Sequence, residues 1–578
     1  MCSARCIGNI YDTEFEVLKM TASNRVLVIG LDGATWDVLD RWVRDQTMPN
    51  LARLRRQGAW GVLRSTIPPI TAAAWSTFMT GKRPAKHGVY HFIKLFDENA
   101  QSEVSELVSS RSIKAPALWD ILGHHDRQVV LVNIPLTYPP RQVNGVMVTG
   151  LLTPRSAPVF TYPPELSQQI ANYKFDLDRF ADKTPFVDEI GGEIIAPTLN
   201  LVNEFREMLE MRRRVTLSLM QSELWDFFMI VFIGTDRMGH YLWDYQAGTA
   251  GSDPASQAIS RAVREYYMRL DEIIGELVQE AGDDVTTLLM SDHGMGPKHT
   301  KRLHVNNWLC DKGWLVAKSA PGTISNPDRW LTRLGLPRDK VGRFVRHMPG
   351  VAKSKLMKKA TEASAAQVDT QNSVAHAIPM FNHIFGIRVN AALDARARSM
   401  AEITRGLCEL RDPFSGKMIV EQVVRGADYY QGPYATNIPD LIVMLNPDYG
   451  ASFRLGRYSS LVTELQVHTQ LGKHRMEGIF VANGRGIKAI AGPLPDLDIE
   501  DIAPTTLHLM GLPVPTDMDG RVLTEVMTPD FAASHPVLCG EPLGFWQENG
   551  DAAFADEVMS QQDEEEIRER LAALGYLE

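Results

Sequence analysis

Three aspartates that each follow an apolar run are the side chains with the clearest chemical potential. Asp32 ends the run VLVIGLD, Asp236 ends IVFIGTD, and Asp292 follows LLMS. Ligand sites of open α/β sheets lie at the carboxyl ends of the strands. A single aspartate there is commonly a turn residue. Three carboxylates at one edge repel each other unless a positive charge lies between them, so this pattern favours a divalent cation site.

Three histidines accompany these aspartates. His240 lies four residues after Asp236, so one helical turn would place both on the same face; His293 adjoins Asp292, and His474 precedes a further apolar run. A mixed oxygen and nitrogen set suits Zn²⁺, with Mn²⁺ as the next choice. Any one of these histidines, taken singly, is typical of a surface or capped core position. Other histidines near the same segments are His87, His91, His299, His304 and His468, of which His468 is the main alternative to His474.

Thr71 raises a separate question in PPITAAAWSTFMTG, residues 68–81. It stands between a proline-rich kink and an alanine-rich helix start. That position on its own predicts a helix N-cap, in which the hydroxyl accepts a backbone hydrogen bond. Trp75, further along, is expected in the core.

Short apolar runs alternate with amphipathic helices, which is typical of the α/β class. The expected helices include 201–221 and 258–282. The expected buried strands are 25–30, 128–134, 227–233, 285–290, 441–445 and 478–483.

The domain organisation follows from breaks in this alternation. Residues 1–24 carry no helix or strand pattern and are expected to be a disordered tail. The core is predicted over 25–316, with an insertion at about 155–210, and again over 376–525. Between them, 317–375 is basic and helical, either a lid or a solvated helix pair. Residues 526–578 form a C-terminal tail with an acidic amphipathic helix, docked or partner-binding.

Composition excludes several classes of protein. A net charge of −10 over 578 residues, with no basic run interleaved with aromatics, argues against nucleic-acid binding. The longest apolar runs, such as FFMIVFIG, are far shorter than a bilayer-spanning helix. No signal peptide is evident at the start, and five cysteines make no disulfide framework. These features predict a cytoplasmic protein.

Taken together, the motifs resemble the alkaline phosphatase superfamily, above all its type I phosphodiesterase/nucleotide pyrophosphatase branch. The resemblance runs from about residue 25 to 525 and implies an alkaline-phosphatase-like core with a central, mostly parallel β-sheet flanked by helices, plus helical insertions. It rests on LDGATWDVLD, MPNLARLRRQGAWG, PPITAAAWSTFMTGKRPAKHGVY, GTDRMGHYLW, SDHGMGP, GKHRMEGIF and DIAPTTLHLMGLPVP, in family order.

The resemblance implies two metal ions and a covalent mechanism. Asp32, Asp292 and His293 would hold one metal together with the oxygen of Thr71. Asp236, His240 and His474 would hold the other. Thr71 aligns with the family nucleophile, so the implied activity is hydrolysis of phosphodiester or related phosphoryl bonds in a small molecule, through a phospho-threonine intermediate.

Neighbouring branches of the superfamily fit less well. Sulfatases need a Cys or Ser that becomes formylglycine, and the alkaline phosphatases proper and the cofactor-independent phosphoglycerate mutases use Ser, whereas this chain has Thr71 followed by three alanines. A phosphonate hydrolase or phospho-group transferase on the same site is one alternative. A catalytically inactive metal-binding or scaffold protein is another. Assembly as a homo-oligomer stays open.

One position departs from the family pattern. Nucleotide pyrophosphatases carry an Asn that binds a non-bridging phosphoryl oxygen, and the matching position here is Phe92, which offers no hydrogen-bond donor. This difference puts nucleotide substrates in doubt. The nearby candidates to replace the Asn are His91, Lys94, Lys298 and Arg302.

Overall fold

The structure is a computed structural model. It describes residues 24–94, 106–177, 195–318, 368–455, 460–465, 472–543, 559–574 and 576.

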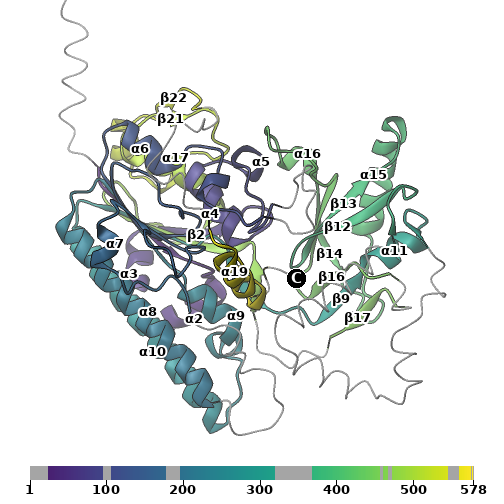
Figure 1. Ribbon diagram of the computed structural model, residues 1–578, viewed down its shortest axis with the longest axis horizontal. Helices are drawn as coiled ribbons and strands as arrows, with labels where there is room; N and C mark the ends of the chain where they lie inside the picture. The colour runs from purple at the N-terminus through teal and green to yellow at the C-terminus, as the bar shows by residue number, and fades with distance from the viewer. Residues whose placement is uncertain are drawn as a thin grey trace, which may run out of the picture.

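A large sheet forms the centre of the described chain (Figure 1). Its nine strands are β1 (Val26–Leu31), β2 (Ala59–Arg64), β3 (Val129–Ile134), β4 (Gly145–Thr149), β5 (Thr161–Tyr162), β6 (Phe227–Phe232), β7 (Thr286–Met290), β19 (Glu477–Gly484) and β20 (Leu494–Asp498). Their order in space is β20-β2-β19-β7-β1-β6-β3-β4-β5. The strands from β7 to β4 run parallel, whereas β19 is antiparallel to both of its neighbours. All residues of β1, β3, β6 and β7 are buried, as expected for parallel strands covered on both faces.

Helices cover both faces of this sheet (Figure 1). One group contains α2 (Trp36–Arg44), α3 (Pro49–Gln57), α8 (Ile195–Ser222), α9 (Gly234–Ala247) and α10 (Pro254–Ala281), in which α10 packs against α3, α8 and α9. The other contains α4 (Thr71–Thr80), α5 (Pro84–His87), α6 (Leu118–His124) and α17 (Ile502–Leu509), in which α4 packs against α5, α6 and α17. The predicted α/β class with a mostly parallel, helix-flanked sheet is confirmed.

Helix α10 illustrates how the sequence sets an element. Asp253 caps it by accepting hydrogen bonds from the backbone of Ala255 and Ser256, and Pro254 occupies its first turn. Apolar residues at positions 259, 263, 266, 270, 273, 274 and 277 recur with the period of a helix and are buried.

A smaller sheet lies beside the large one (Figure 1). It is ordered β12 (Ala375–Phe381), β13 (Ile384–Val389), β15 (Leu441–Leu445) and β14 (Val420–Arg425), all antiparallel. The predicted strand 441–445 is therefore present, and it belongs to this smaller sheet. An apolar run predicts a buried strand but does not indicate which sheet the strand joins. Helix α15 (Leu393–Cys408) packs against β13 and β14 of this smaller sheet. The other, shorter elements are α7 (Leu166–Gln169), α11 (Val305–Asp311), α16 (Gly426–Tyr429), α18 (Pro529–Ser534), β8 (Gly294–Pro297), β9 (Lys301–His304), β10 (Val316–Ala317), β11 (Val368–Asp369), β16 (Tyr449–Ser452), β17 (Val462–Glu464), β18 (Gly472–Arg475), β21 (Val514–Pro515) and β22 (Cys539–Gly540).

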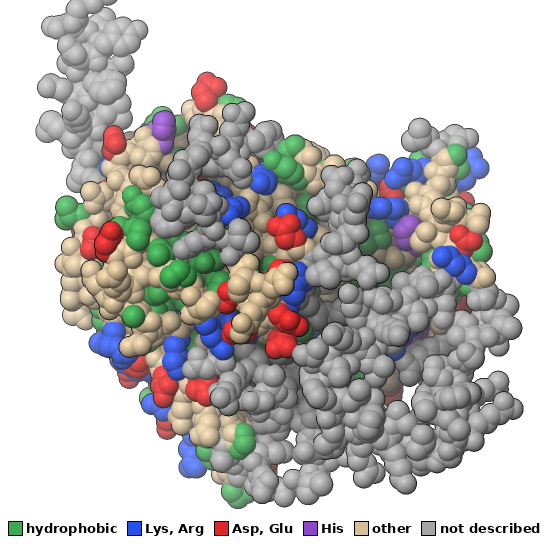
Figure 2. Space-filling view, viewed as in Figure 1, with side chains coloured by type: hydrophobic (Ala, Val, Ile, Leu, Met, Phe, Trp, Pro, Cys, Tyr) green, Lys and Arg blue, Asp and Glu red, His purple; other side chains and the backbone are tan. Residues whose placement is uncertain are grey.

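The C-terminal segment packs on the main core as helix α19 (Gln561–Ala573). Ser560 caps the helix by accepting from the backbone of Asp563. Ile567 and Leu571 belong to the buried core, whereas Glu565 and Glu569 are exposed. Figure 2 shows acidic side chains gathered over the place that α19 occupies in Figure 1. The predicted acidic amphipathic helix is thus present and docked.

Several expectations fall outside the described residues. These are the N-terminal tail up to residue 23, most of the basic segment at 317–375, part of the insertion at about 155–210, and His468. Within the described residues, no helix combines the length and the apolar character needed to cross a membrane.

Candidate metal centre

The three predicted aspartates meet at one edge of the central sheet. Asp32 follows β1, Asp236 lies in the first turn of α9 after β6, and Asp292 follows β7. The three strands are direct neighbours in the order β7-β1-β6 and run parallel, so their carboxyl ends converge. Gly33 permits this approach. Its φ is +67°, and a Cβ there would lie 2.9 Å from the Cα of Asp236.

Each carboxylate has one hydrogen-bonded oxygen. Asp32 Oδ2 accepts from Trp75 Nε1 at 3.1 Å, Asp292 Oδ1 accepts from the backbone of Gly33 at 3.2 Å, and Asp236 Oδ2 accepts from the guanidinium of Arg237. The other oxygens, Asp32 Oδ1, Asp292 Oδ2 and Asp236 Oδ1, are buried and have no hydrogen-bond partner among the described residues. Buried carboxylate oxygens normally accept a hydrogen bond or bind a cation. These three oxygens are therefore candidate ligands for a bound ion.

Two histidines direct a ring nitrogen into the same space. His293 Nδ1 lies 3.1 Å from the carbonyl of Gly294, and His474 Nδ1 lies 2.8 Å from the carbonyl of Pro69. A carbonyl only accepts, so Nδ1–H donates in each ring, and Nε2 keeps its lone pair. Such backbone hydrogen bonds fix the ring of metal-ligating histidines.

The Nε2 atoms face the orphaned oxygens. His293 Nε2 lies 3.3 Å from Asp292 Oδ2 and 3.6 Å from Asp32 Oδ1. His474 Nε2 lies 3.2 Å from Asp236 Oδ1. His240 Nε2 lies 3.4 Å from the same oxygen and 3.0 Å from His474 Nε2. The rings of His293 and His474 stack with their centroids 3.6 Å apart. All six predicted Asp and His residues are thereby brought together.

Thr71 faces this cluster. It is the first residue of α4, and Ile70 occupies the N-cap position. The N-cap prediction for Thr71 is therefore wrong. Its buried Oγ1 instead lies 3.2 Å from His293 Nε2 and 3.4 Å from the hydroxyl of Tyr576. The helix begins one residue earlier than an N-cap at Thr71 would require, because Ile70 has the extended backbone of the cap residue.

Electrostatics show that positive charge is lacking around Asp32 and Asp292 but not at Asp236. Burial raises the pKa of Asp32 well above its usual value, and the charge of Asp236 raises it further. Burial also raises the pKa of Asp292, with Asp32 adding to the effect. Burial works in the same direction on Asp236, but His240 and Arg237 beside it hold its pKa well below the usual value.

His240 and His293 do not supply that charge. Burial lowers the pKa of His240 to about 4 and that of His293 well below its usual value. Both rings are therefore neutral near pH 7, which is the form that binds metals. Two triads have ligand atoms within 4.8 Å of one another: Asp236 with His293 and His474, and Asp32 with Asp292 and His293. Orphaned carboxylate oxygens and neutral imidazoles fit divalent cations.

The other histidines have different surroundings. His87 Nε2 lies 3.1 Å from the Thr77 hydroxyl, and His304 Nε2 lies 3.0 Å from the Thr463 hydroxyl. His299 lies beside cationic side chains, which together with burial lower its pKa to about 3.

The candidate replacements for the missing Asn have varied surroundings. Lys94 pairs with Glu106 at 2.7 Å on the surface, and Lys298 and Arg302 lie beside His299. His91 packs edge-on against Phe92 and Phe381. Phe92 is buried in the main core.

Sequence reasoning missed an ionic network beside the cluster. Arg237 and Asp176 are both fully buried and pair through Nη2–Oδ2 at 2.7 Å and Nε–Oδ1 at 3.1 Å. Arg237 also bridges to Asp236. Arg237 adjoins Asp236 in the chain and could have been suspected, but Asp176 lies in a segment without a motif.

Sequence reasoning also missed Tyr576. Its hydroxyl donates to Asp236 Oδ2 at 3.2 Å and lies 3.4 Å from Thr71 Oγ1. It lies 340 residues from Asp236 in the chain, so local spacing offers no signal for this contact.

The fold and the site together define a class of protein. It is an α/β enzyme with a buried Asp/His cluster at the carboxyl edge of its parallel strands. The family model for type I phosphodiesterase / nucleotide pyrophosphatase matches residues 26–459. The chain belongs to this family, which is part of the alkaline phosphatase superfamily, and it is a phosphodiesterase/nucleotide pyrophosphatase-like hydrolase acting on phosphoryl bonds.

Solved structures of similar fold are more distant in sequence. Phosphonoacetate hydrolase from Sinorhizobium meliloti 1021, in complex with phosphonoacetate, is 15% identical, with 83% of this chain and 94% of that chain covered and a TM-score of 0.48. Human ectonucleotide pyrophosphatase / phosphodiesterase 5 is 13% identical, with coverages of 87% and 100% and a TM-score of 0.44. Its murine counterpart in complex with AMP is 11% identical, with the same coverages and a TM-score of 0.45. No curated protein matches the chain.

Proposed function

We propose that the protein hydrolyses a phosphodiester or a related phosphoryl bond of a small molecule, with Thr71 as nucleophile and two divalent cations in the Asp/His cluster. Zn²⁺ suits the donor set best, and Mn²⁺ is the next choice. Asp32, Asp292 and His293, with Thr71, would hold one cation; Asp236, His240 and His474 would hold the other. The observation that carries the proposal is the placement of Thr71 Oγ1 beside a cluster with three orphaned carboxylate oxygens.

The bound cations would lower the pKa of the threonine hydroxyl and neutralise charge on the phosphoryl group. Thr71 Oγ1 then attacks phosphorus, and the bond from phosphorus to the leaving oxygen breaks. This step forms a phospho-threonine, and the leaving oxygen takes up the proton that Thr71 has lost and departs as an alcohol or phosphate. Water attacks the phosphorus of that intermediate, which restores the threonine hydroxyl and frees the phosphoryl product.

The start of α4 assists Thr71 in this reaction. The helix spans ten residues, and the N–H groups of its first turn have no partner within the helix. These N–H groups can donate hydrogen bonds to phosphoryl oxygens, and the positive end of the helix dipole attracts the same oxygens. Ala72 and Ala73, both fully buried, add no bulk near these groups.

The test replaces Thr71 by alanine and by serine in the metal-loaded protein. We expect Thr71→Ala to lower turnover of bis-p-nitrophenyl phosphate by at least about a thousandfold, as for the loss of other nucleophiles, with metal content retained. Thr71→Ser keeps a hydroxyl and should retain measurable turnover.

Chelation provides an independent check. EDTA followed by dialysis should abolish turnover, and added Zn²⁺ or Mn²⁺ should restore it. Full activity of the Thr71→Ala variant, or of the chelated protein, would contradict the proposal. A panel of aryl diesters, monoesters, phosphonates and sulfates would then rank the substrate classes.

A further inference from the structure

A tyrosine from the last residues of the chain reaches the nucleophile. Tyr576 is buried, and its hydroxyl lies between Thr71 Oγ1 at 3.4 Å and Asp236 Oδ2 at 3.2 Å. The ring packs edge-on against His240 and His474, with centroids 5.4 and 5.3 Å away. The C-terminal segment is therefore part of the wall of the candidate metal centre.

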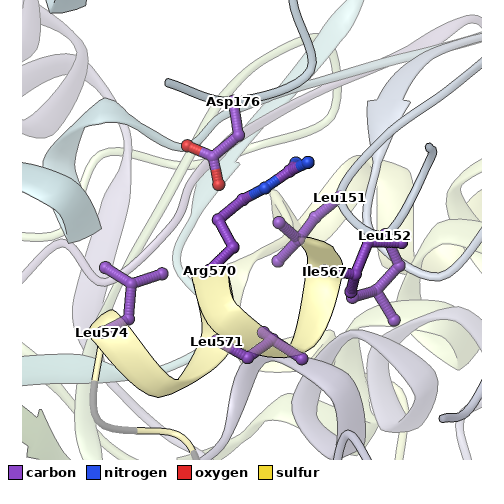
Figure 3. Close-up of a pocket in the computed structure, with 7 residues that line it drawn as sticks. All are labelled: Leu151, Leu152, Asp176, Ile567, Arg570, Leu571 and Leu574. Atoms are coloured by element: carbon purple, nitrogen blue, oxygen red, sulfur yellow. The ribbon is translucent and has the colours of Figure 1, made fainter. Parts of the chain in front are cut away.

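Two sets of contacts anchor this segment. Ile567, Leu571 and Leu574 are buried in the main core. Arg570 is buried too; it pairs with Glu566 at 3.1 Å, and its charge also interacts with that of Asp176. Figure 3 shows Arg570 extending from α19 toward Asp176. The residues around the small hollow in this view are Leu151, Leu152, Asp176, Ile567, Arg570, Leu571 and Leu574.

These anchors connect the tail to the site. Asp176 pairs with Arg237, which in turn bridges to Asp236. The hydroxyl of Tyr576 reaches the same Asp236. The tail thus contacts the metal centre through Tyr576 and lies beside its supporting ion pairs through Arg570.

The ring of Tyr576 also covers the residue that departs from the family pattern. Its centroid lies 4.8 Å from that of Phe92, and it stacks on Phe381 at 6.1 Å with the ring planes 17° apart. The family resemblance implies a hydrogen-bond donor to phosphoryl oxygen at the position of Phe92. The Tyr576 hydroxyl places a donor in that neighbourhood from a different part of the chain.

We propose that Tyr576 is a catalytic residue whose single phenolic proton, donated to Asp236 Oδ2 in this structure, turns to a non-bridging oxygen of the phosphoryl group at Thr71 when substrate is bound. The C-terminal segment thereby completes the active site. This inference rests on the proposed function of Thr71. A non-bridging oxygen lies two bonds from Thr71 Oγ1 once phosphorus is attached, which is within reach of a hydroxyl 3.4 Å from Oγ1.

The chemistry of the phenol suits this role. With an ordinary pKa near 10 a tyrosine hydroxyl is protonated at neutral pH, so it can donate to an anionic oxygen. Donors fixed by packing before the reaction stabilise developing charge without reorganisation. The aromatic contacts on several sides of the Tyr576 ring supply that fixation.

The experiment compares Tyr576→Phe with the wild-type protein, both loaded with metal. The change removes one oxygen and keeps the ring packing. Hydrogen bonds to charged groups predict that kcat/KM for bis-p-nitrophenyl phosphate falls by roughly tenfold to a hundredfold, mainly through kcat. Binding of inorganic phosphate, measured by calorimetry, should weaken by roughly tenfold. The control is Tyr267→Phe, which removes another buried hydroxyl, bonded to Gln246, and should leave both values unchanged.

Two results would overturn the inference. Tighter phosphate binding with a lower KM in Tyr576→Phe would mean that the phenol competes with substrate and the tail is an inhibitor. Unchanged kinetics and phosphate affinity, with an unchanged melting temperature and metal content, would mean that the hydroxyl serves packing alone. If either result is found while Thr71→Ala loses turnover, the proposed function still stands. If Thr71→Ala turned over substrate as fast as the wild-type protein, the proposed function itself would be refuted.

Discussion

The buried pair of Asp176 and Arg237 permits a quantitative prediction. Arg237 is 1% exposed and is held in two-point contact by Asp176, with distances of 2.7 and 3.1 Å. Replacing Asp176 by alanine leaves the guanidinium buried with Asp236 as its remaining close carboxylate. Breaking a buried pair by removing one partner costs about 3–5 kcal/mol, and we expect a loss of stability of that size.

The assay is urea unfolding of the metal-loaded protein followed by tryptophan fluorescence, with thermal unfolding as a second probe. The matched control is Glu210→Gln. Glu210 pairs with Arg269 at 2.5 Å, but these side chains are 33% and 25% exposed, so solvent screening limits the loss to about 1 kcal/mol or less. A loss below about 1 kcal/mol for Asp176→Ala, or equal losses for both variants, would refute the reasoning.

Two further predictions concern single contacts. Trp75→Phe removes the hydrogen bond to Asp32 Oδ2; we expect cation affinity to fall by about tenfold to a hundredfold in a chelator competition, and unchanged affinity would contradict a metal at Asp32. Burial lowers the pKa of His87 from 6.5 to about 3, so the stability contributed by its neutral ring is complete above pH 6.5 and is lost as the pH falls toward 3, by about 1.4 kcal/mol per unit. His87→Gln should flatten the slope of unfolding free energy between about pH 6 and 4, and parallel slopes for variant and wild type would speak against this assignment.

The central sheet was predictable because its strands carry a simple signal. Runs such as 227–233 are apolar throughout, as strands covered on both faces must be, and the aspartates directly after them fall at the carboxyl edge. The strand at 441–445 carries the same signal but pairs in the smaller sheet. The residues of a strand show whether it is buried. Which strands it pairs with depends on the packing of the whole chain.

The candidate site was predictable in its residues and less so in its local geometry. Asp32, Asp236 and Asp292 converge because their strands are neighbours, and His293 follows Asp292 directly in the chain. Thr71 shows the limit of a local rule. A threonine before an alanine run is typical of an N-cap, yet the backbone of Ile70 takes that position and leaves the hydroxyl directed at His293.

The supporting contacts were beyond prediction because they join distant parts of the chain. Asp176 and Arg237 are 61 residues apart, and Tyr576 lies 505 residues from Thr71. No periodicity or spacing connects such positions. The family resemblance singles out Phe92, but nothing near it in the sequence points to Tyr576, which packs on it from the C-terminal segment. An aromatic ring at position 92 also provides a surface on which another aromatic ring can pack. The packing of Tyr576 on Phe92 is one of the contacts that hold its hydroxyl beside Thr71.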